Sequence, residues 1–495
     1  MKKQVMVPAE ELERQKKYMT LCRQELTARF GEARSPLALV RSFGCQQNVS
    51  DGEKLRGMLA EMGCGFSEVL GEADIVLYNT CAVRENAEQK VFGIVGQATH
   101  RKAVKENLLI GLCGCMTQQA HVAGKVKQSY PGVDFVLGTH ALHRFPEILH
   151  GVLKSSGEGR RKRAFAVEES DGVIAEGLPV RRESGVRANL PIMYGCNNFC
   201  TYCVVPLVRG RERSRGSADI LREAGELIAL GYKEITLLGQ NVNSYGKDLE
   251  DDLSFPELLE AVNALPGDFW IRFMTSHPRD CTKELIDTIA HCDKVCSHIH
   301  LPVQCGSDRV LTAMNRHYTR AQYLDIIDYA RKTIPDVNFT SDIIVGFPGE
   351  TYEEFLETVS LVEEVGYSSL FTFIYSPREG TRAARMEDPV PYEEKNRWFQ
   401  QLLEVQRDRG MTYYETCVGR TLRVLVEGEG RLKHGILSGS EPADGQCVLM
   451  GRTAHNMVVD FFGPRSLIGG FADVIITEAA NWALAGRLAD GALAD

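Results

Sequence analysis

Alternation of strand-like and helix-like stretches is the feature that most restricts the fold of this 495-residue chain. Short apolar runs alternate with helical patterns in residues 36–150 and again from 189 to about 377. Such alternation predicts parallel βαβ units, in which the loops after the strands share one edge of the sheet and ligands bind there. The chain is also too long for one hydrophobic core, so we expect several domains.

The first alternating region predicts a parallel α/β domain over residues 36–150. Apolar stretches at 37–43, 73–79 and 107–112 have the composition of buried strands, and each is followed within a few residues by a cysteine: Cys45, Cys81 and Cys115. Helical patterns follow the strands, for example Val83, Ala87, Val91 and Ile94 after Cys81. We therefore expect three cysteines that are distant in sequence to meet at one edge of a sheet.

The second alternating region predicts an open, partial TIM-type (β/α)6 barrel. Six strand-like stretches are separated by helical patterns, at residues 188–194, 233–239, 270–276, 294–303, 337–346 and 369–375. A helical stretch over 391–415 closes this domain, which we place at 189–415. The functional site of such a barrel lies at the carboxyl ends of its strands.

The remaining segments have other textures. Residues 1–35 predict an exposed, charged helical extension, and 151–188 lose the periodic pattern, which predicts a linker. The RRKR run of that linker (160–163) is either a solvated face or a phosphate contact. From 416 to 485, short alternating strands with glycine breaks predict a small antiparallel barrel, before a tail over 486–495. Such barrels often bind nucleic acid, although a plain interaction module has the same pattern.

Composition indicates the compartment and the meaning of the 15 cysteines. No apolar run approaches the ~18 residues that a membrane span needs, and the N-terminus lacks a signal-peptide core, so we expect a cytoplasmic protein. In a reducing compartment, clustered cysteines indicate metal ligation or catalysis rather than disulfides. The net charge of −9 argues against a generally basic nucleic-acid binder, but not against a local basic groove.

The stretch YGCNNFCTYCVVP, which begins at Tyr194, carries three cysteines directly after the first barrel strand: Cys196, Cys200 and Cys203. Iron–sulfur clusters are held by thiolates, usually four, and structural zinc would need a fourth ligand nearby. Three thiolates leave one iron of a four-iron cluster open for the amino and carboxylate groups of S-adenosylmethionine. One electron from the cluster then yields a 5′-deoxyadenosyl radical. The alternative is a chance spacing of buried cysteines.

The other cysteines are less informative. Cys45, Cys81 and Cys115 suggest a second cluster with an open iron, but the spacing leaves structural cysteines as an alternative. Cys113 could replace Cys115 as a ligand. We favour Cys115 because Cys113 lies within the apolar strand, where a cysteine behaves as a small hydrophobe. The remaining cysteines, the pair Cys292 and Cys296 included, are expected to be packing residues.

Four alternating arginines follow the cysteine motif in VRGRERSRG: Arg209, Arg211, Arg213 and Arg215. Arginines beside an active site suit the positioning of nucleic-acid phosphates. A solvated loop is the alternative interpretation.

From about residue 36 to 485 the chain resembles the radical S-adenosylmethionine methylthiotransferases. GCNNFCTYCVVP is similar to their radical signature, with Tyr202 as the aromatic residue beside the adenine. FGCQQN, NTCAVRENAEQKV and GCMTQQ resemble the three segments of their N-terminal domain. That resemblance implies that Cys45, Cys81 and Cys115 hold a second 4Fe–4S cluster.

Later motifs extend the resemblance. LGQNVNSYG, HLPVQCGSDRVLTAMNRHYTR and DIIVGFPGET resemble the barrel's later motifs, and the first of them contains Gln240 and Asn241, the expected S-adenosylmethionine contacts. The segment from TLRVLVEG to FADVIITEA resembles a TRAM domain, a small RNA-binding barrel.

Within the family, LGQNVNSYG and VVPLVRGRERSR are most similar to members that act on isopentenylated adenosine in tRNA. The resemblance implies that one S-adenosylmethionine methylates a sulfur carried by the second cluster. A second S-adenosylmethionine supplies the radical that abstracts hydrogen from carbon 2 of the adenosine beside the anticodon. That adenosine must leave its stack, which costs a few kcal/mol. The implied partners are the tRNA anticodon stem-loop and an external electron donor, with no membrane.

Two departures from the family pattern and three alternatives remain. Gln47 stands where methionine is expected, and Leu207 and Val208 stand where an aromatic and a small polar residue are commoner. Within the family, the substrate could instead be threonylcarbamoyladenosine in tRNA or an aspartate of a ribosomal protein. From another class, the chain could be a two-cluster electron-transfer protein, although open irons suit catalysis better than electron transfer.

Overall fold

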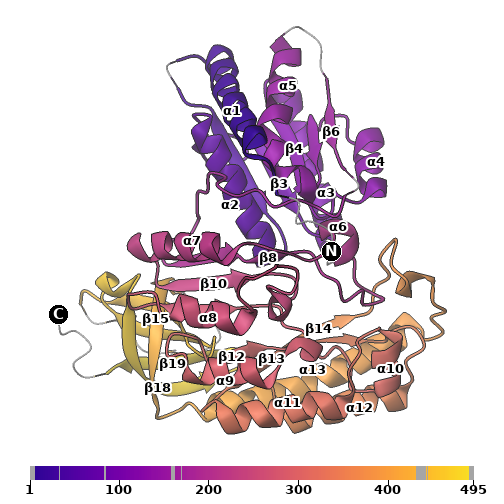
Figure 1. Ribbon diagram of the computed structural model, residues 1–495, viewed down its shortest axis with the longest axis vertical. Coiled ribbons are helices and arrows are strands. Elements are labelled where there is room, and N and C mark those ends of the chain that lie inside the picture. Colours follow the sequence, from indigo (N-terminus) through magenta and orange to yellow (C-terminus); the bar gives the residue numbers. More distant parts are fainter. Residues whose placement is uncertain are drawn as a thin grey trace. The chain divides into compact units, whose positions relative to one another are not determined.

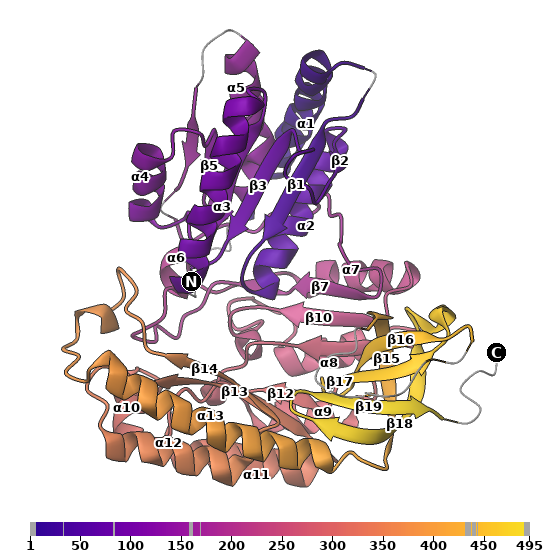
Figure 2. The same cartoon turned by 180° about the vertical axis from the view of Figure 1, so that it is seen from behind.

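The computed structural model describes residues 6–489 apart from 33, 83–84, 158–161, 169, 431–436, 438–441 and 443 (Figures 1 and 2). The chain divides into two compact units. The first comprises residues 1–183, 191–197 and 203–215, and the second comprises 184–190, 198–202 and 216–495. In the described part of the chain, no helix has the length and apolar character to cross a membrane.

The first unit is built on a six-stranded sheet with the strand order β2-β1-β3-β4-β5-β6. All five pairings are parallel. β3 and β4 are buried along their whole lengths, as expected for a parallel sheet that is covered on both faces. The three strands predicted from sequence are confirmed. The bounds are Leu37–Ser42 (β1), Gly65–Phe66 (β2), Ile75–Thr80 (β3), Leu109–Gly114 (β4), Phe135–Leu137 (β5) and Ala164–Ala166 (β6).

Helices cover both faces of this sheet (Figures 1 and 2). One core cluster joins the sheet to α1, α2 and α5. A second cluster joins the other face to α3 and α4. The domain is therefore a doubly wound α/β fold. The bounds are Ala9–Phe30 (α1), Gln46–Glu61 (α2), Glu85–Val104 (α3), Ala120–Ser129 (α4) and Phe145–Gly157 (α5), with a 3-10 turn at Thr139–Arg144 (η1).

The prediction that residues 1–35 form an exposed helix is wrong for one face of α1. Gln15, Met19, Cys22 and Leu26 are buried, and the last three pack in the core cluster with α2 and α5. Their spacing of three and four residues is that of an amphipathic helix. The charged residues between them hide this narrow stripe in a composition-based interpretation.

The prediction of a linker over residues 151–188 is also wrong at its start. α5 continues to Gly157, and β6 pairs with β5 as the last strand of the sheet. Arg163, from the RRKR run, donates hydrogen bonds to carbonyl oxygens at the end of α4 and just beyond it, so it stabilises that helix end instead of contacting phosphate. Arg160 and Arg161 lie outside the described residues. The sequence shows no sign of β6 because a strand of three residues is too short to show a periodic pattern.

The second unit contains the predicted partial barrel. Its strands form two three-stranded sheets, β11-β10-β7 and β12-β13-β14, and a parallel bridge between Ile271 and Val295 joins them. The bounds are Arg187–Pro191 (β7), Glu234–Leu238 (β10), Trp270–Phe273 (β11), His298–His300 (β12), Asn338–Val345 (β13) and Ser369–Ile374 (β14). All six predicted strands are therefore present.

Helices separate these strands, as the alternation predicts (Figure 1). They are Ser217–Ala229 (α7), Phe255–Asn263 (α8), Lys283–His291 (α9), Asp308–Ala313 (α10), Arg320–Thr333 (α11) and Tyr352–Val365 (α12). The predicted closing helix is confirmed as α13 (Tyr392–Glu415). Capping boxes at Ser254, Thr319 and Thr351 begin α8, α11 and α12.

The C-terminal part of the second unit is a closed five-stranded barrel with the order β15-β16-β17-β19-β18. Four pairings are antiparallel as predicted, and β17 pairs with β19 in parallel. The bounds are Thr421–Glu429 (β15), Cys447–Thr453 (β16), Val458–Gly463 (β17), Phe471–Ala480 (β18) and Ala483–Leu488 (β19).

A buried arginine joins this barrel to the rest of the second unit. Arg272 of β11 donates to Glu234 Oε2 at 3.0 and 3.1 Å. It also donates to the carbonyl oxygens of Ala454 and Thr453 at 3.1 and 3.2 Å. Beside it, Trp270 packs on Phe471 with ring centroids 4.7 Å apart. The barrel is therefore a packed part of this unit rather than a module on a free linker.

We predict that Arg272→Met destabilises the second unit by about 3–5 kcal/mol, because it leaves Glu234 buried without its charged partner. The measurement is chemical unfolding followed by tryptophan fluorescence. Arg222→Met is the matched control, since Arg222 and its partner Asp219 are exposed; it should change the stability little, because exposed ion pairs contribute little. Equal losses in the two variants would contradict the structural role of Arg272.

Candidate functional site

The first cysteine triplet lies at the carboxyl ends of three neighbouring strands. Cys45 follows β1 and is the N-cap residue of α2, Cys81 follows β3, and Cys115 follows β4. Because β2 lies on the other side of β1, the strand order reverses between β1 and β3. Ligands of doubly wound sheets bind at this reversal. The predicted meeting of distant cysteines at one sheet edge is thus borne out by the strand order.

Glycines bring the backbone close to these cysteines. Gly44 has a φ of +100°, and a Cβ there would lie 2.6 Å from Cys81 Sγ. Gly114 has the same φ, and its Cβ would lie 2.4 Å from Asn79 Oδ1. A residue with a side chain could therefore not replace either glycine without displacing the site. The Gly-Cys pairs in the sequence are the signal of this arrangement.

The thiols of this triplet interact electrostatically. A hydrogen bond with Cys81, aided by the positive charge of Arg209, lowers the pKa of Cys45 to about 6. Burial raises the pKa of Cys115 to about 11, although Arg209 opposes this shift. Among the described residues, no group of three or more Cys, His, Asp or Glu side chains is arranged to hold a single metal ion. In a four-iron cluster, however, each thiolate binds a different iron.

Polar side chains of α2 and β3 also suit a cluster bound by this triplet. Asn79 Oδ1 and both polar atoms of the Gln47 side chain are buried without a hydrogen bond to any described residue. Such groups suit a bound polar cofactor or an added sulfur, because burial of an unpaired polar group is otherwise costly. The sequence marked Gln47 only as a departure from the family pattern.

Cys113 is placed differently from Cys115. Its thiol lies in the core cluster beneath α1, α2 and α5, where it is 3.7 Å from the Tyr78 carbonyl oxygen. Burial raises the pKa of Cys113 well above its usual value. This environment supports the preference for Cys115 as a ligand.

The second triplet, Cys196, Cys200 and Cys203, follows β7 and the short strand β8 (Met193–Tyr194). β8 pairs with β9 (Arg213–Ser214), and Cys196 lies two residues after the end of β8. Gly195 before it has a φ of +78°, and a Cβ there would lie 2.0 Å from the Arg211 carbonyl oxygen.

Backbone and side-chain donors reach two sulfurs of this triplet. Cys203 Sγ accepts a hydrogen bond from the Val205 amide at 3.5 Å. Cys200 Sγ accepts one from Arg316 Nη1 at 3.4 Å. Cys196 and Cys203 belong to the first unit and Cys200 to the second. The grouping of all three therefore rests on their spacing within one loop.

Buried polar groups gather after β10 and β11, at the carboxyl ends of the barrel strands. Asn241 donates to Asp280 Oδ2 at 2.8 Å, while its Oδ1 accepts no bond from the described residues. The side-chain polar atoms of Asn243, Ser276 Oγ and His277 Nε2 are likewise buried and unpartnered there. Burial lowers the pKa of His277 to about 2, so its ring is neutral. This set fits the polar groups of S-adenosylmethionine. Of its members, the sequence motifs indicated only Asn241, together with the neighbouring Gln240.

Tyr202 and Gln240 are half-buried in the second unit. The side chain of Tyr202 interacts electrostatically with Arg316, the residue that contacts Cys200. This proximity is compatible with its expected place beside the adenine, which stays a prediction.

The four alternating arginines do not share one environment. Arg209, Arg213 and Arg215 are buried, and only Arg211 is exposed. Arg213 donates to the carbonyl oxygens of Arg209 and Arg211, at 3.0 and 2.6 Å. Arg215 holds Glu176 with two bonds of 2.6 and 2.7 Å. The structure therefore gives no support to phosphate contacts by the three buried arginines, because their guanidinium groups already bond to protein.

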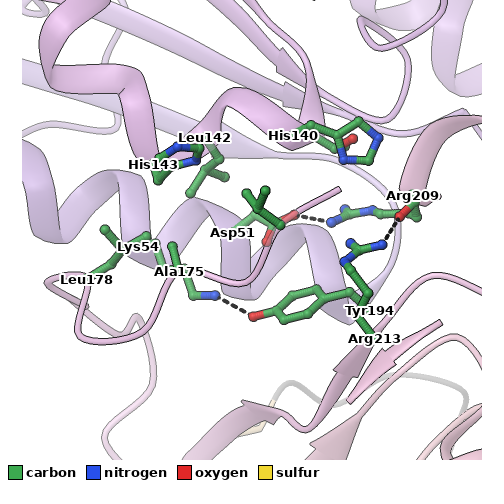
Figure 3. A pocket seen from close by; sticks show the side chains of 12 residues that line it. Asp51, Lys54, His140, Leu142, His143, Ala175, Leu178, Tyr194, Arg209 and Arg213 are labelled. Atoms are coloured by element: carbon green, nitrogen blue, oxygen red, sulfur yellow. Dashed lines mark hydrogen bonds and ion pairs between the residues drawn. The ribbon is translucent and has the colours of Figure 1, made fainter. Parts of the chain in front are cut away.

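Arg209 is the residue whose position the sequence did not anticipate. It ends α6 (Val205–Arg209), and its Nε lies 3.1 Å from Cys115 Sγ. Its Nη1 lies 2.7 Å from Asp51 Oδ2 and its Nη2 2.7 Å from Asn48 Oδ1. The adjacent cavity has a volume of about 40 Å³. It is lined by Asp51, Lys54, Tyr194, Arg209 and Arg213 among others (Figure 3).

Comparison with known proteins identifies three parts of the chain. The radical SAM superfamily matches residues 190–362, the uncharacterized protein family UPF0004 matches 38–138, and the TRAM domain matches 415–489. A solved radical S-adenosylmethionine methyltransferase, TsrM from Kitasatospora setae, has the same fold with a TM-score of 0.50 and 14% identity, over 84% of this chain and 81% of that one.

Similar proteins of known name cover nearly the whole chain. The tRNA-2-methylthio-N(6)-dimethylallyladenosine synthase of Acetivibrio thermocellus is 46% identical over 98% of this chain and 98% of its own length. The synthase of the same name from Clostridium perfringens is 48% identical over 92% of this chain and 98% of its own length. The chain therefore belongs to the family of tRNA-2-methylthio-N(6)-dimethylallyladenosine synthases, which are radical S-adenosylmethionine methylthiotransferases.

Proposed function

We propose that this chain adds a methylthio group to carbon 2 of N(6)-isopentenyladenosine beside the anticodon of tRNA. S-adenosylmethionine serves both as methyl donor and as radical source. The observation that carries the proposal is the cysteine triplet at the ends of β1, β3 and β4, in a chain that also carries the radical motif after β7. The carbon 2 hydrogen is not acidic enough for a side-chain base, so radical chemistry suits this position.

Two 4Fe–4S clusters belong to this proposal. Membership of the radical SAM superfamily implies one cluster and S-adenosylmethionine, and we assign that cluster to Cys196, Cys200 and Cys203. We assign the second to Cys45, Cys81 and Cys115. When bound, the cluster of the radical motif (Cys196, Cys200 and Cys203) supplies the electron that cleaves S-adenosylmethionine. The cluster of the other triplet supplies the sulfur that is transferred.

The chain's own residues hold and orient these groups. Arg316 donates to Cys200 Sγ, to the Tyr318 hydroxyl and to the Pro302 carbonyl oxygen, so it fixes one ligand relative to the barrel. Asn241 is oriented by its hydrogen bond to Asp280, and its side-chain oxygen, which has no partner among the described residues, would accept a hydrogen bond from the amino group of S-adenosylmethionine. Because His277 is neutral, it can bond to the ribose without adding a second positive charge beside the sulfonium.

The proposed tRNA contacts lie on the C-terminal barrel and on Arg211. TRAM-like barrels bind RNA, and Trp482 is exposed in the turn between β18 and β19 with a φ of +76°. Exposed aromatic rings stack on unpaired bases of RNA loops. We also infer an external electron donor and a cytoplasmic location, because tRNA is the proposed substrate.

The division of labour between the triplets gives one prediction. Cys200→Ala should abolish cleavage of S-adenosylmethionine, whereas Cys81→Ala should retain it at least in part and lose thiolation. The measurements are 5′-deoxyadenosine formation, product formation and iron content. Cys292→Ala is the control, because this cysteine is buried outside both triplets, and it should retain both activities. Equal loss of cleavage in both ligand variants, with the cluster of the radical motif still assembled, would refute the assignment. Absence of cleavage in the intact reduced protein would favour an electron carrier.

A second prediction concerns the C-terminal barrel. Trp482→Ala should weaken tRNA binding by about 1–3 kcal/mol, which is about 5- to 150-fold, because one stacked base is lost. Ile468→Ala, at an exposed apolar residue of the same barrel, is the matched control and should bind normally. Affinity is measured by fluorescence anisotropy with an anticodon stem-loop at a fixed salt concentration. Unchanged affinity in Trp482→Ala would move RNA recognition to another surface.

The substrate itself is tested by nucleoside analysis. tRNA from cells with and without the gene is digested and examined by mass spectrometry. Loss of the 2-methylthio isopentenyladenosine, with accumulation of its unthiolated precursor, is expected. Loss of a thiolated threonylcarbamoyladenosine would instead assign the alternative tRNA substrate. Unchanged nucleosides together with an altered ribosomal protein would overturn the tRNA assignment.

A further inference from the structure

Arg209 reaches the first cysteine triplet from the segment that follows the second one. It lies six residues after Cys203, and its three side-chain nitrogens have three different partners: Cys115 Sγ, Asp51 Oδ2 and Asn48 Oδ1. All four residues belong to the first unit. The residue is 6% exposed, so most of its side chain is removed from bulk water.

The packing of α6 holds this arginine in place. Val204 and Val208 of the same segment pack with Ala82 and Cys115 in a small apolar cluster. Thr139 also donates a hydrogen bond to the Val208 carbonyl oxygen. The position of Arg209 is therefore fixed from both sides, by its helix and by its three polar partners.

An ion pair with Asp51 alone would not need this geometry. A lysine could neutralise Asp51, but its single nitrogen could not also occupy the positions of Nε beside sulfur and of Nη2 beside Asn48. The planar guanidinium spans all three partners. The feature specific to arginine is thus the Nε–H···Sγ hydrogen bond to Cys115 made together with the contacts to Asp51 and Asn48.

We propose that Arg209 is a positioning residue that holds Cys115 and raises the reduction potential of the cluster bound by the first triplet. The inference rests on the proposed function, in that Cys45, Cys81 and Cys115 bind a cluster. Hydrogen bonds to ligating sulfurs and nearby charges set the potentials of such clusters. A buried donor that bears a positive charge stabilises the reduced state, which carries one more negative charge, and low local polarity strengthens the effect.

The test isolates the cluster of Cys45, Cys81 and Cys115 in the full-length chain. Cys196, Cys200 and Cys203 are replaced together by alanine, and the remaining cluster is titrated with reductant and followed by electron paramagnetic resonance. In this background, Arg209→Lys should lower the ratio of reduced to oxidised cluster at a fixed potential about tenfold, which corresponds to about 59 mV for a one-electron couple. Arg213→Lys is the matched control, because Arg213 is buried on the same segment and donates to carbonyl oxygens. Its potential should not change.

A charge-neutral variant protects the test against misfolding. Arg209→Met combined with Asp51→Asn leaves no buried charge unpaired, and it should lower the potential in the same direction as Arg209→Lys. Loss of the cluster from both Arg209 variants, in folded protein and with the cluster retained in Arg213→Lys, would support the holding role. An unchanged potential in the Arg209 variants, or an equal shift in Arg213→Lys, would overturn the inference.

Failure of the proposed function gives a different result. If the triple alanine chain binds no iron although it is folded, the second cluster does not exist and the proposal for Arg209 falls with it. If that chain binds a cluster whose potential does not respond to Arg209, only the inference about Arg209 fails.

Discussion

The parallel pairing of β1 with β3 and of β3 with β4 is the constraint on which the first site depends. Parallel strands end at the same edge, so the loops that carry Cys45, Cys81 and Cys115 begin side by side although 70 residues of sequence separate the first from the last. Helices on both faces bury β3 and β4 completely, which fixes the register of the pairing. The placement of these three cysteines is therefore a product of the core and would be lost with it.

The two triplets are built in opposite ways, and this decides what the sequence could reveal. Cys196, Cys200 and Cys203 lie in one loop, so their spacing alone indicated a cluster with an open iron. The first triplet became recognisable only through the predicted sheet and the family resemblance. The spacing could not distinguish Cys115 from Cys113, but the structure separates a loop residue from a core residue. The alternating strands and the six barrel strands were predictable because their apolar runs are long.

The missed features were narrow or depended on tertiary contacts. The buried stripe of α1 occupies one residue in three or four, and β6 has three residues, so neither has a strong periodic signal. The arginines of VRGRERSRG were interpreted by their charge, yet burial gives three of them protein partners. Sequence shows that an arginine is present, but only the fold shows which carboxylate or sulfur it faces.

A buried arginine contacts one cysteine in each triplet, and the comparison explains why arginine is used. Arg209 and Arg316 each have three nitrogens with three different partners, one of which is a cysteine sulfur. The remaining partners of Arg316 are neutral oxygens, whereas Arg209 also pairs with Asp51. The positive charge near Cys200 is thus uncompensated by these contacts, while that near Cys115 is partly neutralised. A cluster beside Arg316 should therefore experience the stronger positive field, and the two proposed clusters would differ in potential although each would be held by three cysteines.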